Sequence, residues 1–188
     1  MNIFAEQIWR LMVEYKKIGN DVRINKSSEI TRPELVELGN HISIDMGVYM
    51  SVSAIIGDYI HIAQHVCIIG GATAHLVMEN FTAIAAGSKI ICASDDFSQG
   101  FLNPFIPIQY RNVINKPIVF KKYSAVGVNS VVLPGVTLAE GSVVGANSVL
   151  TKDTEPWTIY VGSPAVAVKL RNKELILKGA KELGYEWK

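Results

Sequence analysis

The sequence predicts an all-β fold, a three-sided parallel β-helix of about six turns, from three observations. An aliphatic or aromatic residue recurs every six residues along most of the chain. A period of six fits neither an α-helix, which repeats every 3.6 residues, nor a flat strand, which repeats every two. Small or β-branched residues, and Gly, Asn or Asp, hold fixed positions between these residues. Finally, every interruption of the period falls after a third hexad.

The repeat is clearest in the C-terminal half of the chain. Its recurring apolar positions are Phe120, Val126, Val132, Leu138, Val144 and Leu150. Three residues after several of these stand Gly, Asn or Asp, for example Asn129, Gly141 and Asn147. These residue types tolerate the left-handed backbone that a tight corner requires. The pattern therefore predicts short strands joined by corners, with the apolar residue pointing into a narrow core.

The same frame runs backwards through most of the chain. It passes through Met78, Ile84 and Ile90, through Leu38, Ile44, Met50, Ile56, Ile62 and Ile68, and more weakly through Ile18, Ile24 and Ile30. Insertions of two, four and twenty-four residues follow Ile30, Ile68 and Ile90. All three follow the third side of a turn, so we expect them on one edge of the prism. A β-sandwich is the alternative, but strand alternation would not hold this phase.

The frame divides the chain into three segments. Residues 1–17 have helical character and would cap the first turn, since solenoids need capped ends. Residues 18–155 would form the β-helix, with a long loop at 91–117. Residues 156–188 would form a C-terminal arm and helix.

Composition argues against several classes of protein. The net charge of +1 indicates neither a nucleic-acid surface nor a basic membrane-binding patch. No stretch is long and apolar enough to span a bilayer, and charged residues interrupt the apolar N-terminal run, so no signal peptide is expected. Cys67 and Cys92 make neither a disulfide framework nor a zinc set. We expect a cytoplasmic protein without a metal.

Two further motifs give the sequence a family resemblance. The hexads, the long loop after Ile90 and the segment 160–165 (YVGSPA) resemble the hexapeptide-repeat acyltransferases. Within them the chain resembles the galactoside and maltose acetyltransferase branch. It is closer still to sugar acetyltransferases of surface-polysaccharide biosynthesis, through segment 94–98 (SDDFS) followed by Asn103 and Pro104. The resemblance implies left-handed coiling, acetyl-CoA as donor, and a homotrimer with active sites between subunits.

The resemblance also implies a donor site. The donor contacts of the galactoside branch correspond here to Val128, Ala146, Thr151, Lys152 and Lys169. Val128 and Ala146 each follow a middle-side apolar residue by two positions, so the prism would stack them on one edge. Small or apolar residues suit a pantetheine arm, and Lys152, Lys169 and the nearby Arg171 suit phosphates. The alternative for these basic residues is an ordinary solvated surface.

The same edge, followed backwards, leads to the candidate catalytic residues. Three turns at about 4.8 Å each cover roughly 14 Å, so the donor thiol should arrive near the third and fourth turns. His61 and His65 lie there. In the galactoside branch a loop histidine is the base, but Asp95 takes that position here. We therefore predict His61 as general base and His65 as the alternative. Asp95 or Asp96 would orient the histidine or bind the sugar; the histidines could otherwise be ordinary surface residues.

The predicted function is acetyl-CoA-dependent transfer of an acetyl group to a hydroxyl or amino group of a free or nucleotide-linked sugar. The loop 91–117 would be an acceptor lid, a subunit clasp or both, because loops of that length are often functional. One alternative is a non-catalytic trimeric scaffold. Another is a metalloenzyme of the γ-carbonic-anhydrase type, which would need His61, His65 and His75 to converge.

Overall fold

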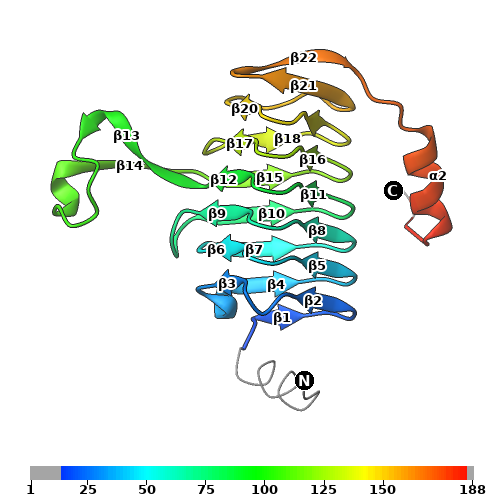
Figure 1. The fold of residues 1–188 in the computed structure, drawn as a ribbon, viewed down its shortest axis with the longest axis horizontal. Coiled ribbons are helices and arrows are strands. Elements are labelled where there is room, and N and C mark those ends of the chain that lie inside the picture. The colour runs from blue at the N-terminus through cyan, green and yellow to red at the C-terminus, as the bar shows by residue number, and fades with distance from the viewer. Residues whose placement is uncertain (1–13, 186–188) are drawn as a thin grey trace.

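The chain winds into a three-sided solenoid of parallel β-sheets, seen in a computed structural model that describes residues 14–185 (Figure 1). The first face contains β1 (Lys17–Ile18), β4 (Val36–Leu38), β7 (Ser53–Ile56), β10 (His75–Met78), β15 (Ile118–Phe120) and β18 (Thr137–Leu138). The middle face contains β2 (Val22–Ile24), β5 (Ile42–Ile44), β8 (Ile60–Ile62), β11 (Ala83–Ile84), β16 (Ala125–Val126), β19 (Val143–Val144), β21 (Thr158–Gly162) and β22 (Ala165–Leu170). The third face contains β3 (Glu29–Ile30), β6 (Tyr49–Met50), β9 (Cys67–Ile69), β12 (Lys89–Ile91), β17 (Val131–Val132) and β20 (Val149–Leu150).

The core is the stack of residues that the hexad frame identifies. Strand pairing sets Ile62 beside Ile44, and Val126 beside Ile84, in neighbouring coils. Five members of the middle ladder are buried: Ile44, Ile62, Ile84, Val126 and Val144. Ile24, in the first coil, is partly buried and packs against the same core. The predicted inward ladder is confirmed.

The solenoid has about seven coils, one more than the hexads predict. The extra coil arises because β21 pairs in parallel with β19, placing Tyr160 beside Val144, 16 positions earlier. Val144 itself pairs with Val126, 18 positions earlier. The last coil is therefore two residues short of three hexads, so it leaves the repeat frame while remaining in the sheet. After it the chain reverses, and β22 runs antiparallel to β21.

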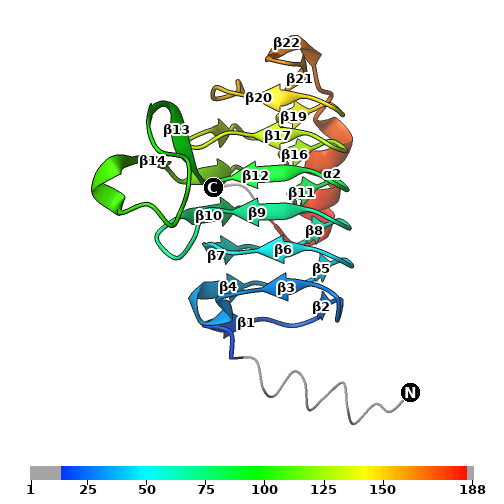
Figure 2. The ribbon, with the colours of Figure 1, turned by 60° about the vertical axis from the view of Figure 1, so that its left-hand side comes forward.

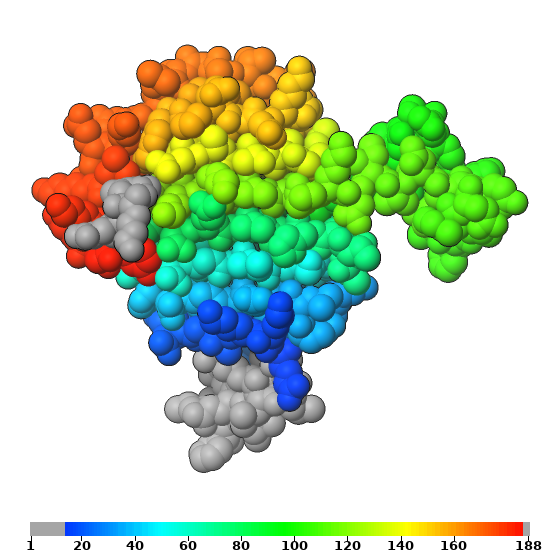
Figure 3. All heavy atoms as spheres, turned by 180° about the vertical axis from the view of Figure 1, so that it is seen from behind, coloured from blue at the N-terminus to red at the C-terminus, as the bar shows by residue number. Residues whose placement is uncertain are grey.

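All three insertions emerge where the third face meets the first face, an edge that we name the loop edge. They contain the short helix η1 (Pro33–Leu35), residues 70–74, and the long insertion after β12. The long insertion forms an antiparallel pair, β13 (Ala93–Gly100) and β14 (Arg111–Asn115), with η2 (Ile108–Tyr110) between them. We call residues 93–115 the arm. Figures 2 and 3 show the arm projecting away from the solenoid. The expectation that the insertions share one edge is confirmed.

The edge between the first and middle faces carries a column of stacked rings, and we name it the aromatic edge. Successive coils place residues with left-handed backbone at this corner: Asp21, His41, Tyr59, Phe81, Tyr123, Gly141 and Trp157. Neighbouring ring centroids along the column lie 4.6 Å apart for His41 and Tyr59 and 5.9 Å apart for Tyr123 and Trp157. Stacking across coils therefore accompanies a backbone conformation that bulky residues rarely adopt.

The C-terminal helix α2 (Glu174–Glu182) is held against the aromatic edge by the residues on either side of it. After the helix, the ring of Tyr185 makes edge contacts with Tyr59 and Phe81, and its hydroxyl donates to Asp58 Oδ2 at 2.8 Å. This confirms the predicted C-terminal helix. The predicted helical cap falls largely on residues 1–13, outside the described residues, and Lys17 already begins β1.

Candidate active site

The edge between the middle and third faces, which we name the site edge, carries the predicted donor column. Gln64, Ala86, Val128 and Ala146 occupy equivalent corner positions in successive coils. Backbone hydrogen bonds fix the stacking: Gly87 N donates to Gln64 O (3.0 Å), Asn129 N to Ala86 O (2.9 Å) and Asn147 N to Val128 O (2.8 Å). Val128 and Ala146 are exposed, so a ligand can lie along this edge.

His65 forms the corner of the third coil on the site edge. Its backbone is left-handed, with φ of 58°, and its amide donates to Met46 O at 3.0 Å. The ring lies over Gly47 of the coil below, where a Cβ would approach His65 Nδ1 to 2.5 Å. Gly47 therefore provides the space that the His65 ring occupies.

His61 lies on β8, on the outer surface of the middle face, and is held by a carboxylate of the coil below. His61 Nε2 is 2.8 Å from Asp45 Oδ2, and Ser43 Oγ donates to Asp45 Oδ1 at 3.0 Å. The hydrogen bond with His61 lowers the pKa of Asp45 below its ordinary value, with smaller help from Ser43. Asp45 follows β5 directly and so stands at the site edge, where it can orient the imidazole ring.

Asp45 was missed by sequence reasoning, although the hexad register contains a signal for it. Ser43 pairs directly with His61 across neighbouring coils. Asp45 lies two positions after Ser43, so its side chain shares the outer surface with His61. The sequence predicts the two loop aspartates as the orienting carboxylates instead.

Both loop aspartates are bound within the arm. Arg111 donates to Asp95 Oδ1 from Nη2 (2.8 Å) and from Nε (3.2 Å), and the Arg111 and Asp95 side chains are only 16% and 17% exposed. Asp96 accepts hydrogen bonds from the hydroxyl and amide of Ser98 and from Asn112, and these contacts, led by the Ser98 hydroxyl, lower its pKa. The arm leaves the loop edge, so within one chain Asp45 contacts His61 and the loop aspartates do not.

The remaining donor candidates do not gather at the site edge of one chain. Thr151 and Lys152 follow β20, at the end of the third face that meets the loop edge. Lys169 lies on β22 opposite Ile159. Of the predicted donor residues, therefore, only Val128 and Ala146 lie on the site edge of one chain.

Arg171, which the sequence assigns to the donor phosphates, makes backbone contacts at the aromatic edge. Its Nη1 donates to the carbonyl oxygens of Tyr123 (2.7 Å) and Gly141 (3.0 Å), and burial lowers its pKa. These contacts hold the C-terminal segment on the aromatic edge. Within one chain Arg171 lies on the aromatic edge and not on the site edge, and its part in the donor site stays a prediction.

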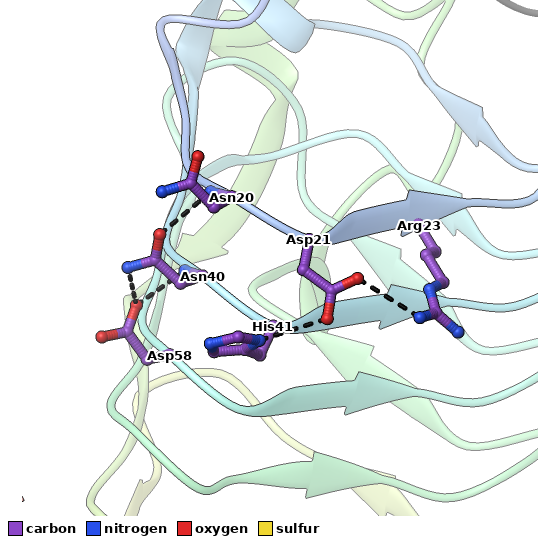
Figure 4. A network of polar contacts seen from close by, with 6 residues as sticks. All are labelled: Asn20, Asp21, Arg23, Asn40, His41 and Asp58. Carbon is purple, nitrogen blue, oxygen red and sulfur yellow. Dashed lines mark hydrogen bonds and ion pairs between the residues drawn. The ribbon is translucent and has the colours of Figure 1, made fainter. Parts of the chain in front are cut away.

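The other histidines serve the solenoid itself. His41 stacks on Tyr59, and its Nδ1 lies 3.1 Å from Asp21 Oδ2; Figure 4 shows this contact beside a ladder of side-chain amides and carboxylates on the same edge. His75 Nδ1 lies 2.9 Å from Ser53 Oγ on the first face. His61, His65 and His75 therefore do not converge, because His75 lies on the first face, away from the other two. Among residues 14–185, no three His, Cys, Asp or Glu side chains are grouped to hold a metal ion. No helix in that range is long and apolar enough to cross a membrane.

Comparison with known proteins gives this arrangement a family. Residues 124–152 match the family model described as hexapeptide repeat of succinyl-transferase. The crystal structure of AntD, an N-acyltransferase from Bacillus cereus, in complex with dTDP and 3-hydroxybutyryl-CoA, matches with a TM-score of 0.89 and 31% identity. That match covers 96% of this chain and 95% of AntD. The chain belongs to the hexapeptide-repeat acyltransferases.

Other members of the family support the same assignment. The dTDP-4-amino-4,6-dideoxy-D-glucose acyltransferase of Escherichia coli is 29% identical over 177 residues, covering 92% of this acyltransferase and 91% of that protein. A chloramphenicol acetyltransferase of Agrobacterium fabrum is 28% identical over 109 residues, about half of each chain. The resemblance drawn from the hexads is confirmed, and the chain is an acyltransferase rather than a scaffold or a carbonic anhydrase.

Proposed function

We propose that this acyltransferase transfers an acetyl group from acetyl-CoA to the amino group of a nucleotide-linked sugar that is used to build a surface polysaccharide. The observation that carries the proposal is the match over nearly the full chain to an N-acyltransferase crystallised with dTDP and an acyl-CoA. A variant of the same protein was crystallised with dTDP-4-amino-4,6-dideoxyglucose and coenzyme A. We also propose a cytoplasmic location, because the protein must meet both acetyl-CoA and a nucleotide-linked sugar in one compartment.

The proposed assembly is a trimer of left-handed prisms. The arm supports it, because its large apolar side chains are exposed in a single chain: Phe97 is 83% exposed and Phe105 is 94% exposed. An exposed apolar group of this kind marks a protein–protein contact. The arm leaves the loop edge, so its aspartates would approach a site edge only on another subunit.

The donor would lie along the site edge between two subunits. Val128 and Ala146 would flank the pantetheine arm, because they are small or apolar and exposed on one edge. Lys152 and Lys169, with Thr151, would bind the phosphates near the C-terminal end of the prism. Thr151 and Lys152 lie at the opposite end of the third face from Val128, so a trimer would supply them from a neighbouring subunit.

The reaction forms a bond between the amine nitrogen and the thioester carbonyl carbon, and the carbon–sulfur bond then breaks. The nitrogen must also lose a proton, which can pass to a base or to the departing thiolate. With the amine the thiolate can take this proton, whereas a hydroxyl acceptor would require a base, and we propose His61 for that role because Asp45 holds Nε2 and leaves Nδ1 for the acceptor. His65, on the same edge, is the alternative. Asp95 and Asp96 of the neighbouring arm would bind sugar hydroxyls.

The decisive experiment is an acceptor screen with the purified protein and acetyl-CoA. The panel contains dTDP-4-amino-4,6-dideoxyglucose, its 4-hydroxy counterpart, simple galactosides and chloramphenicol. Release of the CoA thiol and the mass of the product are measured together. We expect acetylation of the amino sugar at a kcat/KM at least about 10³-fold above that of the others, because an amine is the better nucleophile and the diphosphate adds binding. Transfer to galactosides or chloramphenicol alone would refute the proposal.

A further inference from the structure

Lys89 is a cation in the outer surface of the third face, in the fourth coil. It pairs across the coils with Cys67 below and Val131 above, neither of which carries an opposite charge. Its side chain is partly buried. A charged group that is partly removed from water needs hydrogen bonds and an opposite charge to offset lost hydration.

The ammonium group of Lys89 is turned toward the site edge. Its Nζ donates a hydrogen bond to the carbonyl oxygen of Gly87, which forms the corner of the same coil. Within residues 14–185 no Asp or Glu forms an ion pair with Lys89. An ammonium group has three N–H donors, and one carbonyl satisfies one of them. The other two donors, and the charge, remain for an anion at the site edge.

The corner next to Lys89 lies in the middle of the proposed site. Gly87 N donates to Gln64 O of the third coil, and Asn129 N of the fifth coil donates to Ala86 O. Gly87 has a φ of 71°, and a Cβ there would overlap the amide oxygen of Asn129. Lys89 therefore lies one coil above His61 and His65, and one coil below Val128.

We infer that Lys89 binds the diphosphate of the nucleotide-linked acceptor, an inference that rests on the proposed function. CoA and the nucleotide-linked sugar carry their diphosphates at different distances from the reacting atoms. The position of a cation along the site edge therefore indicates which diphosphate it binds. In CoA a pantetheine arm of roughly 14 Å, or three coils, separates the thiol from the diphosphate. A donor thiol at the third and fourth coils therefore puts the CoA diphosphate near the top of the prism, where a neighbouring subunit would supply Lys152. In a nucleotide-linked sugar, one sugar ring separates the reacting amine from the diphosphate, so a charge in the fourth coil fits the acceptor.

The test measures binding of dTDP, thymidine and CoA, each alone, by calorimetry to wild type, Lys89→Met and Lys89→Arg. Lys89→Met should weaken dTDP binding about 10-fold or more, the usual scale of a charge-assisted contact, and leave thymidine and CoA unchanged. Lys89→Arg keeps the charge and should retain most of the affinity. Lys181→Met, on the exposed side of α2, is the control and should bind all three ligands as wild type does.

Three outcomes would overturn the inference. Unchanged dTDP binding in Lys89→Met would remove the residue from the acceptor site. A matching loss for CoA would assign it to the donor. Dissociation of the Lys89→Met oligomer in sedimentation would make Lys89 a subunit contact. In each of these cases the proposed function stands if the wild-type protein acetylates the amino sugar. The proposed function itself is refuted if the wild-type protein neither binds dTDP nor transfers acetyl to the amino sugar.

Discussion

The pairing of His61 with Asp45 shows how a solenoid builds a polar site from distant parts of the sequence. The two residues are 16 positions apart and meet because one coil lies on the next. Asp45 remains charged at neutral pH, since its hydrogen bonds with His61 and Ser43 lower its pKa. The His61–Asp45 pair is exposed at the site edge, where an acceptor can reach it. Whether the acceptor is an amine or a hydroxyl then determines how much the reaction depends on this pair.

His61→Ala distinguishes an amine acceptor from a hydroxyl acceptor. With the amino sugar at a pH above the amine pKa, kcat should fall by less than about tenfold, because an uncharged amine attacks without prior loss of a proton. With any hydroxyl acceptor that is turned over, the loss should reach about 10² to 10⁴, the usual scale for a positioned general base. Asp45→Asn should follow the same order with smaller losses.

The measurement is steady-state kcat for both acceptors at saturating acetyl-CoA, with His41→Ala as a histidine control on the aromatic edge. A loss of about 10² or more with the amine would mean that a base is required even there. Equal kcat in wild type and His61→Ala for a hydroxyl acceptor would exclude His61 as the base, and His65 would become the residue to test.

Among the structural elements, the aromatic edge couples the coils to the C-terminal segment. Trp157 lies over Gly141, and its ring centroid is 5.9 Å from that of Tyr123 two coils below. Gly141 has a φ of 68°, and a Cβ there would overlap the Trp157 ring. A side chain at this position would therefore meet both steric overlap and an unfavourable backbone conformation.

Two glycine substitutions test this coupling with the same chemical change. Gly141→Ala should lower the free energy of unfolding by about 1–3 kcal/mol, the usual cost of strain and overpacking. Gly179→Ala is the matched control, because its Cβ would meet nothing within 4 Å inside α2. It should stabilise the helix by up to about 1 kcal/mol, the difference in helix propensity between the two residues. Urea unfolding followed by circular dichroism checks both; equal midpoints for the two variants would show that the Trp157 contact does not matter.

The elements also show where sequence reasoning succeeds and where it stops. The hexad period identifies the inward residues because one apolar side chain per strand must fill a narrow core. It does not reveal β13 and β14, which project from the prism and have no repeat to follow. It also ends before β21, where Tyr160 fills the core although the coil is two residues shorter. Asp45 was missed for a related reason. Its contact with His61 depends on which outward-facing residues of neighbouring coils lie side by side, and the apolar repeat identifies only the inward-facing ones.

At the scale of the whole molecule, the two parts of the candidate site lie on different edges. The site edge carries His61, His65 and Val128, whereas the loop edge carries the arm with Asp95 and Asp96. A rigid prism cannot bring these edges together, so the proposed site, which includes Asp95 and Asp96, requires a second copy of the chain. The exposed rings of the arm give that copy a hydrophobic surface to bury.

The double variant Phe97→Ser and Phe105→Ser should therefore dissociate the trimer. Burying two such rings contributes about 1.5–3 kcal/mol each, and the threefold arrangement multiplies the loss over three contacts. Sedimentation velocity at micromolar concentration should show a trimer for wild type and a monomer for the variant, with acetyl transfer falling in parallel. Leu175→Ser is the control, because Leu175 is 81% exposed on α2 and far from the arm in sequence. A variant that remains trimeric and fully active would show that the arm holds neither the assembly nor the site, and the shared-site arrangement would have to be abandoned.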